Sequence, residues 1–431
     1  MKRIIPLFKR AAPLFRLATE YTAAHMFTRL LAAIGGLMLV RLLPVNEYGV
    51  YTLVLAAFSF ICTFSDMGAT ESLAYFRRRA GIRNRSWVHY FQAALRFRQA
   101  VFVFGFVASA AYVFFTARHI GENTQTILTA ILLMGFAAWF AIQSGIIAYA
   151  LKLEQRFRQA YAVEISNEAV KLFAIILIWF FGWVTSISGM TGIAAGALIA
   201  AILANSFLVH PLINTEKQKR QRVRRSGRIL LGQIMPVLPG NIHFALQGPL
   251  ITWLAAYYGS VINVAEVGAL GRIGLLVSVI AGFTVTVFIP RLIAIKDGAL
   301  FIKRYLQWWL VLIVFSGVMM LAIWTFPEAL LFLLGDAYSG LNVELMVVAA
   351  TAVIWSWNGY LYSVNRAMGW VRYQEYILIA LIAGQVSMFA YLEFSSTLGV
   401  LFFGMGTALL WVTYQLVLNA TGFMKIDKHD N

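Results

Sequence analysis

Long apolar runs separated by short polar segments dominate this sequence. Twelve of these runs reach or exceed the 18–25 residues or so that a helix needs to cross roughly 30 Å of hydrocarbon. The pattern therefore predicts an all-α polytopic membrane protein with twelve transmembrane helices. The predicted spans cover about 23–43, 48–76, 97–117, 126–150, 163–184, 190–213, 229–257, 266–292, 304–326, 342–366, 373–394 and 398–421.

The most basic stretch of the chain falls near its middle and divides the predicted helices into two sets of six. An even split of this kind is typical of transporters built from two related halves. We interpret the basic run as an orientation signal that contacts anionic lipid, with a gating role as the alternative. The sequence thus predicts an amphipathic cytoplasmic segment (1–22), an N-terminal six-helix bundle (23–213), a basic cytoplasmic linker (214–228), a C-terminal six-helix bundle (229–421) and a cytoplasmic tail (422–431).

The composition supports the same class. Hydrophobic residues make up 61% of the chain and charged residues 12%, and the mean hydropathy is +0.76, whereas soluble domains contain about 25% charged residues. The net charge of +17 would suggest nucleic-acid binding in a soluble protein. Here most of the 35 Lys and Arg residues lie in alternate loops, which predicts that both termini are cytoplasmic. We therefore expect no nucleic-acid partner.

Ionisable side chains inside apolar spans are costly in lipid and therefore indicate function. We interpret Arg29, Arg272 and Lys171 as lumen cations, because a guanidinium can hold diphosphate oxygens with paired hydrogen bonds. The candidate coupling or lumen acids are Asp66, Glu71, Glu164 and Glu168. Glu164, Glu168 and Lys171 follow each other at four and three residues and so share one helix face. The alternatives are internal ion pairs, such as Arg29 with Asp66 or Glu168 with Lys171, and side chains that reach the membrane surface.

The seventh predicted span is rich in residues that interrupt a helix. Proline removes a helical hydrogen bond, so we expect this span to be kinked or broken. Broken helices at mid-membrane depth often expose backbone groups to a substrate or ion, so the segment is either a hinge or part of a site. The residues concerned are Pro236, Pro239, Asn241, His243 and Pro249.

The tenth predicted span combines aromatic and polar residues. Its aromatic side chains would stack on sugar rings if they faced a cavity, or form an interfacial belt near the membrane boundary. The pattern favours the belt. The residues are Trp355, Trp357, Tyr360 and Tyr362, with Asn358, Asn365 and Arg366 between or beside them.

Several stretches resemble one family. Residues 41–51 read R-L-L-P-x-x-E-Y-G-V-Y and residues 64–76 read F-S-D-M-G-A-T-E-S-L-A-Y-F. Both are similar to the first two helices of polysaccharide transporters, the lipid-linked oligosaccharide flippases of the multidrug/oligosaccharidyl-lipid/polysaccharide (MOP) exporter superfamily. Further similar stretches follow in the family's order at Val267–Ile273 with Phe288–Leu292, Leu334–Tyr338, Asn365–Trp370 and Thr397–Gly404.

The resemblance implies a MATE-like, V-shaped pair of six-helix bundles that rock around a central cavity. It implies a flippase that translocates undecaprenyl-diphosphate-linked oligosaccharide across the bacterial cytoplasmic (inner) membrane for O-antigen lipopolysaccharide, capsule or exopolysaccharide synthesis. The implied partners are this substrate, membrane lipid, a glycan polymerase and a chain-length regulator. No cofactor is expected, and a proton or sodium gradient would drive transport.

Two other functions occur among membrane proteins of this kind. A MATE-type multidrug or cation antiporter would need an acidic lumen. A membrane glycosyltransferase or polymerase would need large outer loops or an acidic catalytic motif, and the sequence shows neither. It also has no G-x-x-x-x-G-K-[ST] phosphate loop and no His-Glu-x-x-His metal pair. We therefore expect a transporter, not an enzyme, and no metal site.

Overall fold

The computed structural model of the chain describes residues 5–82, 87–208, 220–235, 238–293, 295, 297–368, 370 and 374–426, and the regular elements in these ranges are helical. The first half contains α1 (Ile5–Leu42), α2 (Val45–Asp66), α3 (Ala69–Ile82), α4 (Val88–His119), α5 (Thr124–Leu153), α6 (Phe157–Phe180) and α7 (Ser186–Leu208), followed by α8 (Arg220–Ile234). The second half contains α9 (Leu238–Leu254), a π-helical turn (Ala255–Gly259), α10 (Val261–Ile293), α11 (Gly298–Thr325), α12 (Pro327–Leu334), a 3-10 turn (Asp336–Tyr338), α13 (Asn342–Ala367), α14 (Gln374–Met388) and α15 (Thr397–Ile426).

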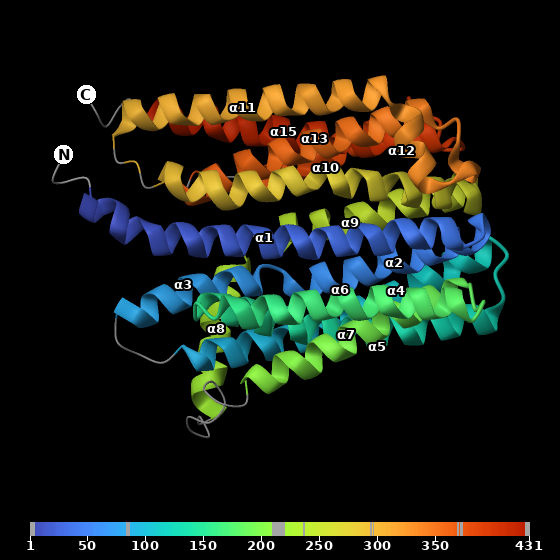
Figure 1. The fold of residues 1–431 in the computed structure, drawn as a ribbon, viewed down its shortest axis with the longest axis horizontal. Helices are drawn as coiled ribbons and strands as arrows, with labels where there is room; N and C mark the ends of the chain where they lie inside the picture. Colours follow the sequence, from blue (N-terminus) through green and yellow to red (C-terminus); the bar gives the residue numbers. More distant parts are fainter. Residues whose placement is uncertain are drawn as a thin grey trace.

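Most of these helices run side by side along one axis, and α1 begins at the same end of the bundle at which α15 finishes (Figure 1). We call this the terminal end and the opposite one the far end. Seven helices within the described ranges are long and apolar enough to cross a membrane, and the bent pair formed by α8 and α9 gives an eighth span if it is counted as one. The fold is thus that of an all-α polytopic membrane protein, and the number twelve stays a prediction.

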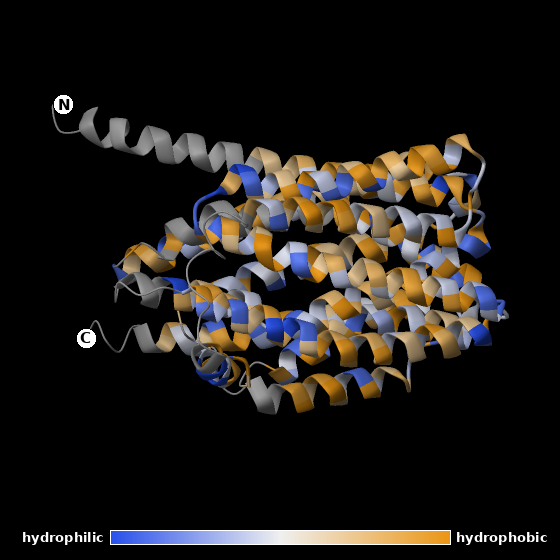
Figure 2. Ribbon diagram, turned by 90° about the horizontal axis from the view of Figure 1, so that it is seen from below, coloured by the Kyte–Doolittle hydropathy of each residue, from blue (hydrophilic) through white to orange (hydrophobic). Residues whose placement is uncertain are grey.

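Many large apolar side chains lie on the outside of the bundle. Phe104, Phe115, Leu132, Phe180 and Trp324 are each at least 68% exposed. Figure 2 shows hydrophobic positions along the length of the helices and hydrophilic positions gathered at the turns, with others inside the bundle. Such a surface would be unfavourable in water but matches the acyl chains of a bilayer.

The predicted span 48–76 is not one helix. The first helix of this stretch ends at Asp66, and Met67 and Gly68 follow with φ angles of 40° and 85° before α3 begins at Ala69. Left-handed residues end an α-helix, since the next amide can no longer continue the hydrogen-bond pattern. Asp66, Gly68 and Glu71 lie at this break, but no proline marks it, so the prediction continued the span across it.

Two predicted boundaries also lie inside helices. The segment 1–22 was predicted as separate, but from Ile5 onward it is continuous with the first span, because α1 runs from Ile5 to Leu42. The end of the predicted linker (214–228) and the start of the seventh span together form α8. The axes of 223–234 and 238–259 then meet at 73°, so the predicted interruption of the seventh span is present, between α8 and α9. Residues 209–219 lie outside the described ranges.

The two halves pack tightly together near the far end. One buried apolar cluster includes Leu39 and Leu53 from the first half and Leu254 and Leu270 from the second. Glycines allow the close approach of α2 and α10. A Cβ atom on Gly49 would overlap the backbone of Val261, and one on Gly268 would overlap the side chain of Thr52. The far end is therefore closed by direct contact between the halves.

Candidate functional site

A cavity of about 110 Å³ lies where α1, α2, α5, α6 and α7 of the first half meet α10 of the second. We call it the inter-half cavity. Its polar lining comes from Asn167, Glu168 and Lys171 on α6 and from Arg272 on α10, and Tyr51 also faces it. Two of the three predicted cations thus meet here, from helices about a hundred residues apart in the sequence.

Arg272 crosses from α10 toward the first half. Its Nε donates a hydrogen bond of 3.1 Å to the hydroxyl of the fully buried Tyr48, and its guanidinium carbon lies 6.0 Å from the ring centroid of Tyr51. The aliphatic part of the side chain passes over Gly36, where a Cβ atom would lie 3.0 Å from Arg272 Cδ. Within the described residues, no ion pair joins Arg272 to a carboxylate. Arg272 is therefore a cation that Tyr48 and Tyr51 hold in place, and it has no carboxylate partner among the described residues.

Glu168 and Lys171 form an ion pair one helical turn apart on α6. Their side chains are only 13% and 19% exposed, and Asn167 donates a 3.2 Å hydrogen bond to the Glu168 carboxylate. The pair that the spacing suggested as an alternative is thus present. Because Lys171 neutralises Glu168, Arg272 leaves the inter-half cavity with a net positive charge.

The other predicted ionisable residues lie elsewhere. Asp66 pairs with Arg98 on α4 at 3.5 Å instead of with Arg29, and Thr70 bonds to both. Arg98 lies within α4 and is buried.

Glu164 pairs with Lys152 at 2.6 Å and does not line the inter-half cavity. Arg29 is exposed on α1 and does not line it either. Glu71 belongs to α3, and its side chain is outside the described part of the structure. The roles proposed for these three residues stay predictions.

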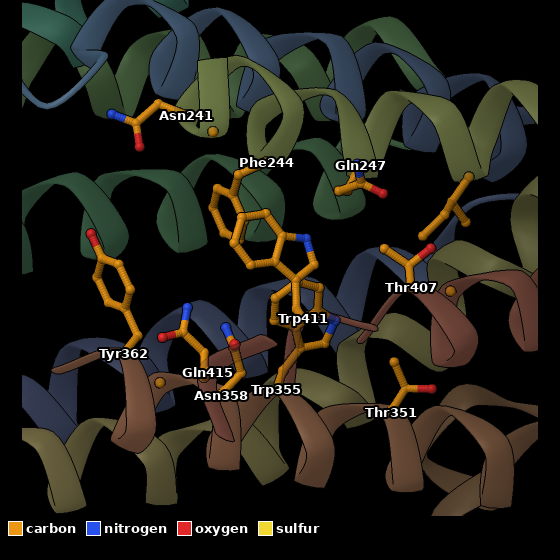
Figure 3. Close-up of a pocket in the computed structure, with 15 residues that line it drawn as sticks. Asn241, Phe244, Gln247, Thr351, Trp355, Asn358, Tyr362, Thr407, Trp411 and Gln415 are labelled. Carbon is orange, nitrogen blue, oxygen red and sulfur yellow. The ribbon is translucent and has the colours of Figure 1, made fainter. Parts of the chain in front are cut away.

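A larger cavity of about 660 Å³ lies inside the second half, between α9, α13 and α15 (Figure 3). We call it the C-half pocket. Its lining is aromatic and polar but uncharged, and comes from Asn241, Phe244, Gln247, Thr351, Trp355, Asn358, Tyr362, Thr407, Trp411, Gln415, four glycines and Ile251. Trp355 and Tyr362, two aromatic residues of the tenth predicted span that were expected to form an interfacial belt, thus line a cavity instead, and Asn358 of the same span lines it with them.

A buried network of hydrogen bonds holds the side-chain amides of two residues that line this pocket, Gln247 and Gln415. His243 Nε2 lies 2.9 Å from Gln385 Oε1, and Gln385 Nε2 donates to Gln247 at 2.8 Å and to Thr407 at 3.0 Å. A second group joins Asn365 to Gln415 at 2.8 Å. Hydrogen bonds hold a buried amide in one orientation, so Gln247, bonded through both its amide nitrogen and its oxygen, and Gln415, bonded through its oxygen, are positioned before any ligand arrives.

The segment that was predicted to be kinked or broken, from Pro236 to Pro249, contributes residues to the C-half pocket. Asn241 lines the pocket, and His243 is buried behind it in the amide network. Pro249 lies within α9, and its carbonyl accepts a hydrogen bond of 3.2 Å from Tyr112 on α4 of the first half. Pro239 is half-buried near the start of α9, while Pro236 lies outside the described ranges. The segment is thus next to a cavity as well as next to a bend.

Sequence reasoning did not single out the contribution of α15. Thr407, Trp411 and Gln415 recur every four residues and so share one face of a helix. The recurrence of these side chains every four residues in an otherwise apolar run is the sequence signal that could have indicated a polar face on α15.

A third cavity, of about 640 Å³, lies between α4 and α8. Arg96, Arg224 and Arg228 line it, and all three are exposed. This basic surface agrees with the lipid contact expected of the central basic run. The described residues contain no group of three or more His, Cys, Asp or Glu side chains suited to a metal ion.

Comparison with known proteins relates this arrangement to membrane transporters. An inward-facing multidrug resistance MATE-family transporter of the MOP superfamily aligns with a TM-score of 0.67 at 13% identity, covering 93% of this chain and 95% of that one. Lipid II flippase MurJ in an inward closed conformation aligns with a TM-score of 0.67 at 12% identity, covering 95% and 90%. An outward-facing MATE-family transporter gives 0.58 at 12% identity, covering 96% and 95%. These similarities show that the fold is MATE- and MurJ-like.

A search of curated protein sequences gives no match. The sequence model of the family described as polysaccharide biosynthesis protein matches residues 18–296, which is more than half of the chain. The match extends from α1 through α10 and so includes the whole lining of the inter-half cavity. The chain therefore belongs to the polysaccharide biosynthesis protein family, and its fold is the one found in transporters of the MOP superfamily.

Proposed function

We propose that the protein is a flippase that moves an oligosaccharide linked to a polyprenyl diphosphate, such as undecaprenyl diphosphate, across the membrane. The observation on which this proposal depends most is Arg272, a half-buried cation between the two halves with no carboxylate partner among the described residues. A charge held in that way is costly unless an opposite charge arrives with a ligand. A diphosphate is such a ligand.

The chemistry of the inter-half cavity matches a phosphate group. The guanidinium has five N–H donors in a planar fork, and the one on Nε donates to Tyr48. The remaining fork can hold two phosphate oxygens, and Lys171 lines the same space. A volume of about 110 Å³ suits a phosphate group but not an oligosaccharide, so the glycan must lie elsewhere.

The outer surface of the bundle suits the polyprenyl chain of the substrate. The apolar side chains exposed on α4, α6 and α11 match the acyl region of the bilayer, so a polyprenyl chain can remain in lipid while the head group crosses between the halves. The closed far end supports one state of an alternating-access cycle, in which the substrate enters from the terminal end.

The same proposal includes the membrane, the orientation, the energy source and the partner proteins. The terminal end would face the cytoplasm of a bacterial inner membrane, and a proton or sodium gradient would drive the cycle. A glycan polymerase and a chain-length regulator would take the product for O-antigen, capsule or exopolysaccharide assembly. The family match supports a role in polysaccharide biosynthesis.

A MATE-type antiporter for cationic drugs is the second candidate, because the inter-half cavity also contains the Glu168 carboxylate. That carboxylate is paired with Lys171, so the cavity offers a cationic drug no free acid. The net charge of the lining therefore favours the anionic substrate.

Transport in proteoliposomes tests the proposal. A fluorescent label on the sugar of undecaprenyl-diphosphate disaccharide becomes accessible to a membrane-impermeant quencher when the head group is flipped. We expect faster loss of protected fluorescence with the protein than in protein-free vesicles, and no transport of the cation ethidium. Ethidium transport without disaccharide flipping would contradict the proposal and favour drug export.

A further inference from the structure

The C-half pocket has a chemistry that diphosphate binding does not use. We propose that this pocket binds uncharged sugar units of the transported glycan, namely neutral hexoses or N-acetylhexosamines. The inference rests on the proposed function, because it identifies where the part of the substrate that the inter-half cavity cannot hold would bind.

Glycine residues, which have no side chain to fill the space, give the pocket part of its volume. Gly248 and Gly359 line it, and a Cβ atom on either would meet no atom within 4 Å. These glycines are therefore not there to let two helices approach each other. They leave open space, and about 660 Å³ lies within the range of small-molecule sites.

Aromatic rings supply the apolar part of the lining. Trp355 and Phe244 meet edge to face with ring centroids 5.8 Å apart, and Trp411 lies beside them (Figure 3). Pyranose rings have apolar C–H faces and polar edges, so a wall of this kind can stack on a sugar ring while leaving its hydroxyl groups free.

The lining of the C-half pocket also contains polar atoms that have no hydrogen-bond partner, as a site for sugar hydroxyl groups would. Trp411 is only 6% exposed, yet its indole N–H has no hydrogen-bond acceptor, and the buried Oδ1 of Asn358 has no donor. Buried donors and acceptors in native proteins are nearly always bonded. A sugar hydroxyl both donates and accepts, so one class of ligand would satisfy the two atoms, while Gln247 and Gln415 are already held in place by the amide network.

The charge of the lining decides which sugars fit. None of the lining residues is Asp, Glu, Lys or Arg. An acidic sugar would leave water without a counter-charge, which is strongly unfavourable. The exposed Arg366 lies beside the pocket and donates a hydrogen bond to the hydroxyl of Tyr362. The pocket is therefore selective for neutral units.

Isothermal titration of the full chain in lipid nanodiscs tests this inference, with N,N′-diacetylchitobiose and digalacturonic acid as probes. We expect chitobiose to bind at least about tenfold more tightly than digalacturonic acid. Trp355→Leu should weaken chitobiose binding about tenfold or more. Trp411→Phe, which keeps a ring but removes the N–H donor, should weaken it about threefold.

Trp324→Leu is the matched control, because Trp324 is 68% exposed on α11 and should leave binding unchanged. Trp355→Phe serves if the leucine variant does not fold. Equal binding of the two probes, or unchanged chitobiose binding in the Trp355 and Trp411 variants, would overturn the inference.

The two proposals fail separately. Chitobiose has neither lipid nor diphosphate, so Arg272→Ala should leave its binding intact. Chitobiose binding without flipping of the lipid-linked disaccharide would refute only the transport proposal. Flipping without chitobiose binding would refute only the sugar pocket.

Discussion

Replacing Arg272 is the sharpest perturbation that the structure offers. Truncation to alanine would remove the guanidinium from the inter-half cavity and leave the Tyr48 hydroxyl without its donor. Because Arg272 has no carboxylate partner among the residues described, its loss should not strand an opposite charge. The protein should therefore fold, and the effect should fall on substrate binding.

The magnitude follows from the bonds that the ligand would lose. Hydrogen bonds to charged groups contribute about 1.5–3 kcal/mol each, so two of them contribute about 3–6 kcal/mol before allowance for solvent. Since Arg272 is only half-buried, we take the lower limit. About 3 kcal/mol corresponds to a loss of roughly 150-fold in affinity for the substrate.

Graded variants separate charge from geometry. Arg272→Lys keeps the charge but not the fork, and should lose about tenfold. Tyr48→Phe removes one contact that orients Arg272, a hydrogen bond that contributes about 0.5–1.5 kcal/mol, and this variant should lose about two- to tenfold in affinity. Arg118→Ala is the matched control, because Arg118 is an exposed arginine near the far end that bonds to Thr124.

The assay is the initial rate of disaccharide flipping at low substrate in proteoliposomes with equal amounts of each variant. Gel-filtration profiles in detergent would confirm that each variant is folded. The reasoning is refuted if Arg272→Ala retains more than a third of the wild-type rate. It is also refuted if Arg118→Ala loses as much, since the effect would then reflect the overall charge of the protein.

Three further predictions concern the fold. Gly268→Ala should force α2 and α10 apart, because the added Cβ would overlap Thr52; a bulky thiol reagent should then label a cysteine placed at Val264 faster than in the Gly268 parent, and an equal rate would contradict the tight contact. Asp66→Asn should destabilise the protein by about 1–3 kcal/mol in unfolding titrations, since Arg98 would remain buried without its counter-charge, and Arg98→Met combined with it should recover part of the loss. Burial, and then the nearby Glu47 carboxylate, raise the pKa of Glu122 in the loop before α5, so its ionised form lowers stability above the folded-state pKa and this cost disappears as the pH falls. Glu122→Gln should therefore raise the unfolding temperature at neutral pH and make no difference below about pH 4, whereas a gain that persists in acid would point to another cause.

The apolar pattern predicted the class and most of the helices, because lipid requires long apolar segments whatever their partners are. It did not show the break at Met67 and Gly68, because no proline marks the turn and apolar residues follow again at Leu73 and Ala74. Nor could it show α8 as a separate helix, since the basic residues were interpreted as a linker.

Partners of charged residues were beyond the sequence. Spacing on one helix correctly suggested the Glu168–Lys171 pair, since residues three apart are neighbours on a helix. The partners of Asp66 and Arg272 come from other helices, and only tertiary packing brings them together. The C-half pocket was missed for the same reason, because its lining comes from three separate helices and its volume from glycines.

The central claim is that a cation between the two halves binds the diphosphate of the substrate. A cryo-electron microscopy map of the protein in nanodiscs with undecaprenyl-diphosphate disaccharide tests it most directly. We predict density for the diphosphate within hydrogen-bonding distance of the Arg272 guanidinium. Density for the diphosphate away from Arg272 and Lys171, with both side chains unchanged, would contradict the claim.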